Sequence, residues 1–138
     1  MTVREALLDT SAAIALIVGD HAGHVATRDA VRGLRLGLAG HAWFETYSAL
    51  TRLPGSSRRL PHDAHRLLLH DFPASRYLSE EQAHALRDDL ARAGIAGGSV
   101  YDALVGAAAR MHGLPLLSRD RRAATVYAVL DVDVRLID

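Results

Sequence analysis

The sequence predicts an α/β fold, a three-layer α/β/α sandwich with a mostly parallel central sheet. Short apolar segments typical of strands alternate with helical segments along the whole chain, and this alternation indicates a parallel sheet with helices on both faces. The chain has 138 residues, of which 49% are hydrophobic, enough to bury one core. There is no internal repeat and no linker-like segment, so residues 1–138 are expected to form a single domain.

The expected strands are short apolar runs bounded by turn or capping residues. They cover residues 6–9, 36–39, 75–78, 114–117 and 132–137. The first ends in an acid, the second lies between glycines, and the last shows the alternation of a half-buried strand.

The expected helices begin and end at residues that favour helix termini. They cover residues 12–18, 23–32, 41–53, 61–72, 80–93, 99–112 and 121–130. Thr10 and Ser11 are expected to supply the N-cap of the first helix. Pro61 occupies the first turn of the fourth. Ser79 and Gln82 have the spacing of a capping box before the fifth.

Composition excludes several classes of function. The chain has no cysteine, so disulfides, thiolate metal sites and a cysteine nucleophile are excluded. Its net charge is zero and all 16 basic residues are arginine, so a lysine base is excluded and phosphate contacts must come from guanidinium groups. The apolar run 12–19 is too short to span a bilayer, and Asp9 interrupts the pattern of an export signal. We therefore expect a cytoplasmic protein that does not associate with membranes.

Four acids follow predicted strands or begin predicted helices. Asp9 ends the first strand, and Asp120 follows the 114–117 strand by three residues. Asp102 lies in the first turn of the helix that starts at Ser99, and Glu45 lies in the helix after the 36–39 strand. Ligands of parallel α/β sheets collect at the carboxyl ends of the strands, so these four side chains are expected to converge there.

Each acid also has a purely structural interpretation. Asp9 and Asp120 could cap the helices that follow them, and Asp102 could complete a capping box with Ser99. Glu45 lies among apolar and aromatic residues, where a buried carboxylate requires a partner or a metal ion. His41, one turn earlier, is its local alternative partner.

Clustered carboxylates point to divalent-metal chemistry. They repel one another, which raises their pKa values unless a cation is present. An all-oxygen ligand set suits Mg²⁺ or Mn²⁺, and these ions commonly act on phosphoryl oxygens and activate water. On this reasoning Asp9 and Asp120 would be direct ligands and Asp102 a ligand directly or through water, while Glu45 would be a ligand or the general base.

The motifs at these acids resemble a known family. They are LLDTS at residues 7–11, Glu45 in its helix, GGSVYDAL at 97–104 and LLSRDRRA at 116–123. Together they resemble the PIN-domain ribonucleases, specifically the VapC-type toxins of bacterial toxin–antitoxin pairs. The similarity extends over essentially the whole chain, in the expected order.

This resemblance implies a metal-dependent endoribonuclease. Asp9, Glu45, Asp102 and Asp120 would bind Mg²⁺ or Mn²⁺, and a metal-activated water would cleave cellular RNA such as tRNA or rRNA. Ser118 would hold the last acid or a bound water. Thr10 or Ser11 would support the site in the same way. The resemblance also implies a homodimer that is neutralised by a cognate VapB-type antitoxin.

Three arginines next to the last acid are candidates for contacts with RNA phosphates. They are Arg119, Arg121 and Arg122, and their alternative is a solvated helix face. Arg121 and Arg122 also stand where some family members carry a further acid or amide, so the number of metal ions stays open.

Other functional interpretations remain at this point. A catalytically silent PIN-like domain could bind protein or RNA as a scaffold. A phosphate-handling receiver domain also clusters acids, but it would need a lysine, which this chain lacks. The histidine pairs 21/24 and 62/65 have zinc-like spacing without an evident third ligand, so ordinary surface histidines are the simpler interpretation.

Overall fold

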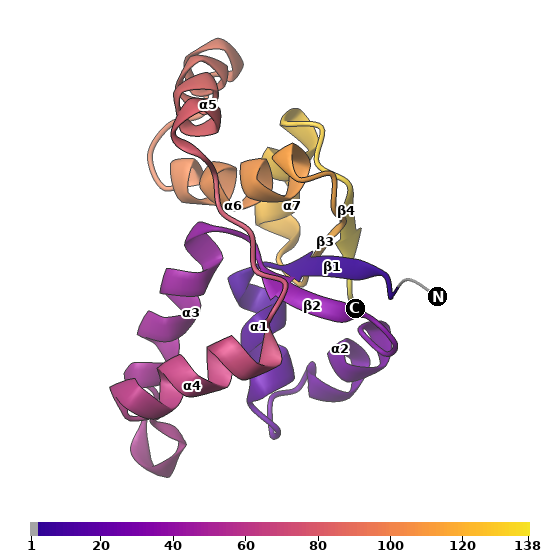
Figure 1. Cartoon of the computed structure of the whole chain (residues 1–138), viewed down its shortest axis with the longest axis vertical. Helices are drawn as coiled ribbons and strands as arrows, with labels where there is room; N and C mark the ends of the chain where they lie inside the picture. The colour runs from indigo at the N-terminus through magenta and orange to yellow at the C-terminus, as the bar shows by residue number, and fades with distance from the viewer. Residues whose placement is uncertain (1–2) are drawn as a thin grey trace.

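The computed structural model describes residues 3–138, which form seven α-helices, one short 3-10 helix and four strands. The strands are β1 (Glu5–Leu8), β2 (Arg35–Leu38), β3 (Leu116–Ser118) and β4 (Val134–Leu136). All paired strands are parallel, and their order across the sheet is β2-β1-β3-β4. The predicted parallel sheet is confirmed, with the two strands that carry the acid motifs at its centre (Figure 1).

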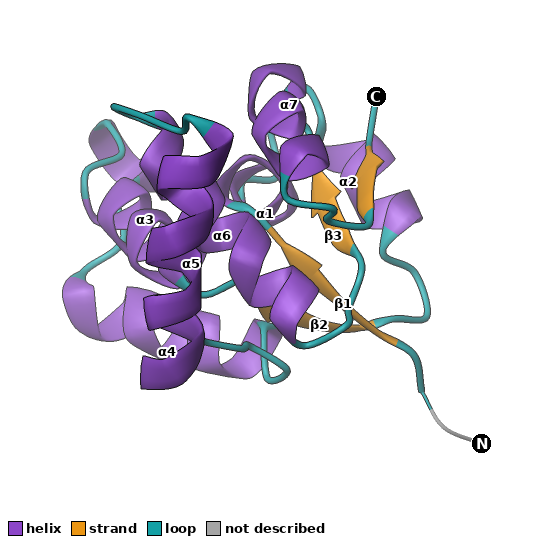
Figure 2. Ribbon diagram, turned by 90° about the horizontal axis from the view of Figure 1, so that it is seen from above, coloured by secondary structure: helices purple, strands orange, loops and turns teal. Residues whose placement is uncertain are grey.

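The helices confirm the predicted pattern, and their ends agree with the expected ends to within two residues. They are α1 (Thr10–Ile17), α2 (His24–Ala30), α3 (His41–Thr51), α4 (Pro61–Asp71), α5 (Glu80–Ala93), α6 (Ser99–Met111) and α7 (Arg121–Val129), with the 3-10 helix η1 at Gly55–Ser57. Seen from above, α3 to α6 gather to one side of the strands (Figure 2). Within the described residues, no helix combines the length and apolar character needed to cross a membrane.

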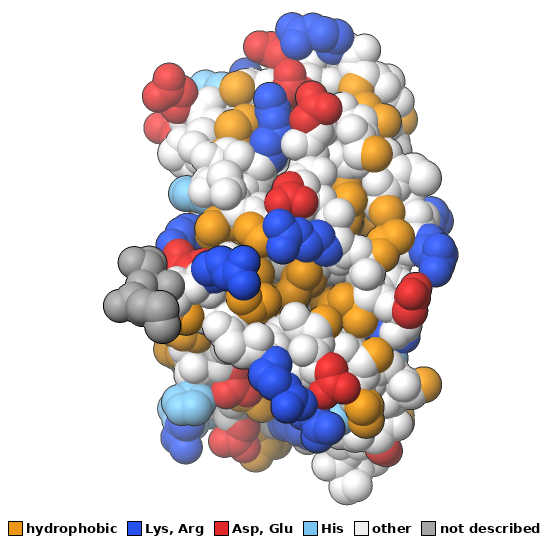
Figure 3. All heavy atoms as spheres, turned by 90° about the vertical axis from the view of Figure 1, so that its right-hand side faces the viewer, with side chains coloured by type: hydrophobic (Ala, Val, Ile, Leu, Met, Phe, Trp, Pro, Cys, Tyr) orange, Lys and Arg blue, Asp and Glu red, His pale blue; other side chains and the backbone are white. Residues whose placement is uncertain are grey.

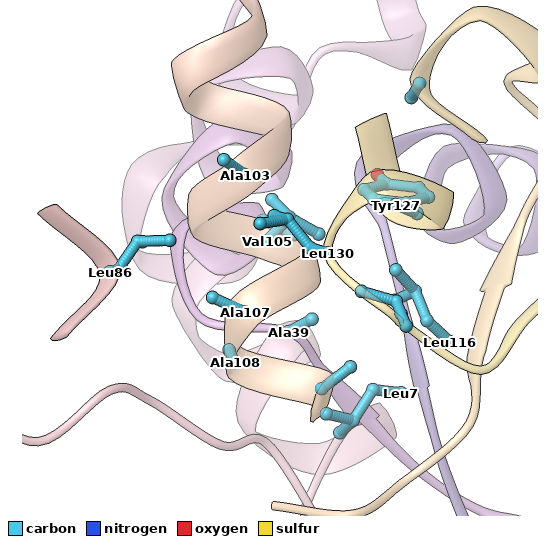
Figure 4. Packing of buried hydrophobic residues seen from close by; sticks show 14 residues of the cluster. Leu7, Ala39, Leu86, Ala103, Val105, Ala107, Ala108, Leu116, Tyr127 and Leu130 are labelled. Atoms are coloured by element: carbon cyan, nitrogen blue, oxygen red, sulfur yellow. The ribbon is translucent and has the colours of Figure 1, made fainter. Parts of the chain in front are cut away.

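Helices cover both faces of the sheet, as the sandwich prediction requires. Successive strand residues point to opposite faces. Leu7 and Leu116 therefore pack with buried residues of α6 and α7, a cluster shown in Figure 4. Leu8 and Leu117 belong to the other core, with buried residues of α1 and α4. The three-layer α/β/α architecture follows from this alternation.

The strand expected at residues 75–78 is not formed. The segment runs beside β2 and makes only one isolated bridge, between Ala39 and Arg76. The Ser75 hydroxyl accepts the hydrogen bond of the Leu38 amide at 2.9 Å and donates to the Phe72 carbonyl at 2.8 Å. The Ser75 side chain thus takes the place of a backbone carbonyl as the partner of the Leu38 amide, and this interrupts the pairing of the segment with β2.

Two predictions about helix caps had opposite outcomes. The capping box of α5 is confirmed, because the Ser79 hydroxyl accepts from the Gln82 amide and the Gln82 side chain accepts from the Ser79 amide. The prediction that Thr10 and Ser11 cap α1 is wrong. Both lie inside α1, and the Asp9 carboxylate caps it by accepting from the Ala12 amide.

The strand order creates a natural binding position between β1 and β3. The chain leaves β1 toward β2 on one side and later returns to β3 on the other side. Neighbouring strands whose connections diverge leave a crevice at their carboxyl ends, where ligands of α/β proteins bind. Asp9 directly follows β1, and Asp120 follows β3 by two residues, so both lie at this crevice.

Candidate active site

The four predicted acids line one small pocket, hereafter the acid pocket. Its volume is about 130 Å³, and it is lined by Asp9, Thr10, Ser11, Glu45, Asp102, Val105, Asp120, Arg122 and Tyr127. These residues come from the ends of the central strands and from α1, α3, α6 and α7. The structure therefore brings the four acids together at one place, as expected from the sequence.

Asp9 is the most firmly held of the four acids and is only 4% exposed. Its Oδ1 accepts from the Ser11 hydroxyl at 2.6 Å and from the Ala12 amide at 3.1 Å. Its Oδ2 accepts from the Ser118 hydroxyl at 2.5 Å and from the Tyr127 hydroxyl at 2.9 Å. Four donors compensate the buried charge and hold the carboxylate in one orientation.

Two serine hydroxyls connect the β1 and β3 sides of the pocket. Ser11 donates to Asp9 and accepts from the Arg119 amide at 2.8 Å. Ser118 donates to Asp9 and accepts from the Asp120 amide at 3.0 Å. Ser118 was expected to hold the acid two residues later or a metal-bound water. In the structure it contacts the backbone of Asp120 and the side chain of Asp9.

Asp120 combines a structural role with a place in the acid pocket. It is the N-cap of α7, where its Oδ1 accepts from the amides of Arg122 at 2.9 Å and Ala123 at 3.1 Å. Its Oδ2 lies 4.0 Å from the Arg122 guanidinium. The capping interpretation holds, and a capped carboxylate is one whose position is well defined.

Asp102 lies in the first turn of α6 and does not cap it. The N-cap of α6 is Gly98, which makes no side-chain cap bond, so the capping box considered as an alternative for Ser99 and Asp102 is absent at this helix. Burial raises the pKa of Asp102, nearby Asp120 adds to this rise, and Arg122 opposes it. Such a carboxylate favours a neighbouring cation.

Glu45 is more exposed than its apolar sequence context predicted. Its side chain is 38% exposed, and its Oε1 lies 3.7 Å from His41 Nε2. Partial burial raises the pKa of Glu45, His41 lowers it, and the charges of Asp102 and Asp9 raise it further. The histidine partner considered from sequence is thus present, and the carboxylate still faces the other acids.

The donor set of the acid pocket fits a magnesium-like ion. All four charged groups offer oxygen, and the Thr10 hydroxyl is buried with no hydrogen-bond partner among the described residues. Among residues 3–138, no three histidine, aspartate or glutamate side chains are arranged to hold one ion together. Mg²⁺ usually takes one or two protein carboxylates and keeps several waters, so water between ion and acids would complete this pocket.

Tyr127 is a site residue that the sequence analysis missed. It is 1% exposed, and its hydroxyl donates to Asp9. Burial raises its pKa strongly, as do the charges of the nearby acids, so the hydroxyl stays a donor. Gly106 makes room for its ring, since a Cβ there would lie 2.9 Å from Tyr127 Cδ1. The sequence contained one signal for Tyr127: it lies seven residues after Asp120, which is about two helical turns and therefore the same face of the helix.

The three arginines after Ser118 point to different places. Arg122 lines the acid pocket. Arg119 donates to the Asp138 carbonyl oxygen at 3.1 Å, and Arg121 pairs with the Asp138 carboxylate at 3.0 Å. These two line a separate pocket together with residues 136–138. The expected contacts of all three with RNA stay a prediction.

Comparison with known proteins identifies the family. The pattern of the PIN domain matches residues 6–129 of the chain. A chain of a solved structure described as FitAB bound to an IR36 DNA fragment superposes with a TM-score of 0.71. At 18% identity, with 95% of this chain and 94% of that chain covered, it supports the fold. The chain belongs to the PIN-domain family.

Curated relatives narrow this class. Ribonuclease VapC27 of Mycobacterium tuberculosis is 45% identical over 127 residues, covering 92% of this chain and 93% of its own length. Ribonuclease VapC40 of the same species is 44% identical over 133 residues, covering 94% of this chain and 96% of its own. Within the PIN-domain family, the chain is of the VapC type.

Proposed function

We propose that this protein is a VapC-type endoribonuclease that depends on Mg²⁺ or Mn²⁺ and acts as the toxin of a toxin–antitoxin pair. The observation that carries the proposal is the acid pocket, in which four carboxylates converge at the carboxyl ends of β1 and β3. The relatives that cover nearly the whole chain are named ribonucleases. Clustered carboxylates that do not each have a positive partner favour the binding of a divalent cation. Such a cation commonly acts on the phosphoryl oxygens of a phosphodiester substrate.

The chain's own residues divide the work as follows. Asp9 and Asp120 would hold the ion, Asp9 through its fixed orientation and Asp120 through its place at the start of α7. Asp102 would bind the ion directly or through water. A bound Mg²⁺ or Mn²⁺ would supply Lewis acidity toward the phosphate and the attacking water.

In this proposal Glu45 would serve as the general base. Its side chain is partly exposed, so water reaches it, and its pKa is raised above the ordinary value by burial. A raised pKa brings a carboxylate closer to the range in which it accepts a proton efficiently. His41, 3.7 Å away, would hold the carboxylate toward the pocket. Arg122, which also lines the acid pocket, would bind a phosphate oxygen.

The partners are part of the same proposal. The substrate would be a cellular RNA, with tRNA or rRNA as the expected classes, and a VapB-type antitoxin would neutralise the activity. We further propose that the toxin is a homodimer. Coexpression with the antitoxin should restore growth of cells that express the toxin, and light scattering should give twice the mass of the chain.

The experiment that tests the activity is a digest of total cellular RNA by purified protein. Mn²⁺ or Mg²⁺ should produce discrete fragments whose ends can be mapped, and a chelator should abolish them. Asp9→Asn and Glu45→Gln should lose cleavage and growth inhibition. Asp88→Asn, an exposed aspartate on α5 outside the acid pocket, is the matched control.

The alternative function is a catalytically silent binding domain. The same digest distinguishes it from the nuclease. If folded Asp9→Asn and Glu45→Gln proteins keep full cleavage and growth inhibition, the acid pocket is not the catalytic centre. If the wild-type protein binds RNA but leaves it intact with either metal, the silent domain is the correct interpretation.

A further inference from the structure

A second pocket adjoins the acid pocket along α3, hereafter the α3 pocket. Its volume is about 300 Å³, and it is lined by Thr10, His41, Phe44, Glu45, Ser48, Ala49 and Arg52. Thr10 and Glu45 line both pockets. A polymer with one linkage at the four acids would therefore continue over this surface.

Two exposed aromatic rings lie at or beside the α3 pocket: Phe44 lines it, and Tyr101 stacks on the lining residue His41. Tyr101, the residue before Asp102, stacks on His41 with ring centroids 5.3 Å apart and an interplanar angle of 25°. Tyr101 is nevertheless 54% exposed, so much of its ring faces solvent. Phe44, which lines the pocket, is 58% exposed. Exposed aromatic faces are costly to hydrate and are the surfaces on which unpaired bases stack.

A positive charge lies at the other end of the α3 pocket. Arg52 lies seven residues after Glu45, about 10 Å along the helix at 1.5 Å per residue. Its Nε donates to the Ser48 hydroxyl at 3.2 Å. Its guanidinium pairs with no carboxylate among the described residues. It can therefore accept a phosphate without first breaking an ion pair.

We propose that the RNA strand next to the cleaved linkage runs along the α3 pocket, with an unpaired base stacked on the exposed face of Tyr101 beside the pocket and a phosphate at Arg52. This inference rests on the proposed ribonuclease function and adds where the strand lies and which features of it are recognised. Aromatic stacking accepts any base, so this subsite selects single-stranded RNA over a duplex, in which the bases stack on each other. His41 stacks on the other face of the Tyr101 ring.

The test is binding of two labelled strands by fluorescence anisotropy in the Asp120→Asn background, which removes a carboxylate and keeps an N-cap residue. One strand is an unstructured single-stranded RNA, and the other is a ribose-phosphate strand of the same length without bases. Tyr101→Leu should raise the Kd for the RNA about 5- to 150-fold, the range of one base–aromatic stack. Tyr101→Phe should keep the affinity.

The strand without bases separates stacking from general damage. Tyr101→Leu should leave its Kd unchanged, whereas Arg52→Gln should raise the Kd of both strands. Leu69→Ala, an equally exposed apolar side chain on α4, is the control and should change neither. Equal losses on both strands, no loss on either, or no binding of RNA by the background protein would overturn the proposal.

Three further outcomes keep this proposal distinct from the proposed function. If Tyr101→Leu halves the mass of the protein in light scattering and leaves RNA affinity unchanged, the aromatic surface is a contact between copies, and the nucleotide subsite is refuted. If wild-type protein cleaves RNA while Tyr101→Leu has unchanged binding, only the subsite fails. If stacking is confirmed but no RNA is cleaved, only the nuclease function fails.

Discussion

The hydrogen bond from Tyr127 to Asp9 links α7 to the end of β1 and can be measured by one substitution. Tyr127→Phe removes the hydroxyl and keeps the ring that packs against Gly106, so no cavity forms. The Oδ2 atom of Asp9 then retains a single donor, Ser118. A hydrogen bond to a charged group contributes about 1.5–3 kcal/mol, so the free energy of unfolding should fall by about 2 kcal/mol.

A double-mutant cycle with Asp9→Asn assigns this loss to the pair. Urea unfolding of wild type, both single variants and the double variant gives the coupling free energy. We expect at least 1 kcal/mol of coupling, because the substituted pair lies in direct contact. Metal-free buffer keeps the ion out of all four measurements.

Metal affinity measures whether Tyr127 also orients Asp9 for metal binding. Side chains that hold a metal ligand in place commonly change metal affinity 10- to 100-fold when they are removed. Tyr127→Phe should therefore bind Mn²⁺ more weakly in titration calorimetry. A coupling near zero together with unchanged Mn²⁺ affinity would refute the reasoning, since the hydroxyl would then have no effect on Asp9.

The remaining predictions concern the acid pocket and its packing. Millimolar Mg²⁺ or Mn²⁺ should raise the Tm of chelator-treated protein, because an ion that binds only the folded state stabilises it, by about 2.7 kcal/mol at an ion concentration 100 times the Kd. A Tm that does not change with metal concentration would count against a metal site. The pKa values of Glu45 and Asp102 are raised in the folded state, so the native protein binds more protons and metal-free stability should fall as pH rises above the ordinary carboxyl range. Glu45→Gln should flatten that pH dependence in denaturation curves. Gly106→Ala should cost about 1–3 kcal/mol of stability by overpacking against Tyr127, whereas Gly19→Ala, with nothing within 4 Å of the added Cβ, should cost far less.

Much of the fold is encoded locally, which is why the sequence predicted it. Helical periodicity, Pro61 at a helix start and the Ser79 capping box depend on neighbours a few residues away. The prediction of a strand at residues 75–78 was wrong because pairing of this segment depends on a contact that is distant in sequence. The Ser75 hydroxyl takes the Leu38 amide, 37 residues earlier, out of the ladder.

The candidate site divides in the same way. Motif spacing, together with the resemblance to PIN-domain ribonucleases, indicated Asp9, Asp102 and Asp120, because strand ends and helix starts are recognisable in sequence and parallel strands share one carboxyl edge. The sequence also singled out Glu45, although it predicted a buried carboxylate where the structure has a partly exposed one. Exposure depends on how α3 sits against its neighbours, and local pattern does not contain that information.

The sequence by itself therefore determined the fold class, the order of the elements and the four acids that converge. Only the tertiary structure decided the hydrogen bonds that hold Asp9, in which the donors Ser118 and Tyr127 lie 109 and 118 residues away along the chain. It also decided that Arg122 faces the acids while Arg121 pairs with Asp138. The physical reason is that side-chain partners depend on how helices are seated on the sheet, and packing across both layers sets that seating.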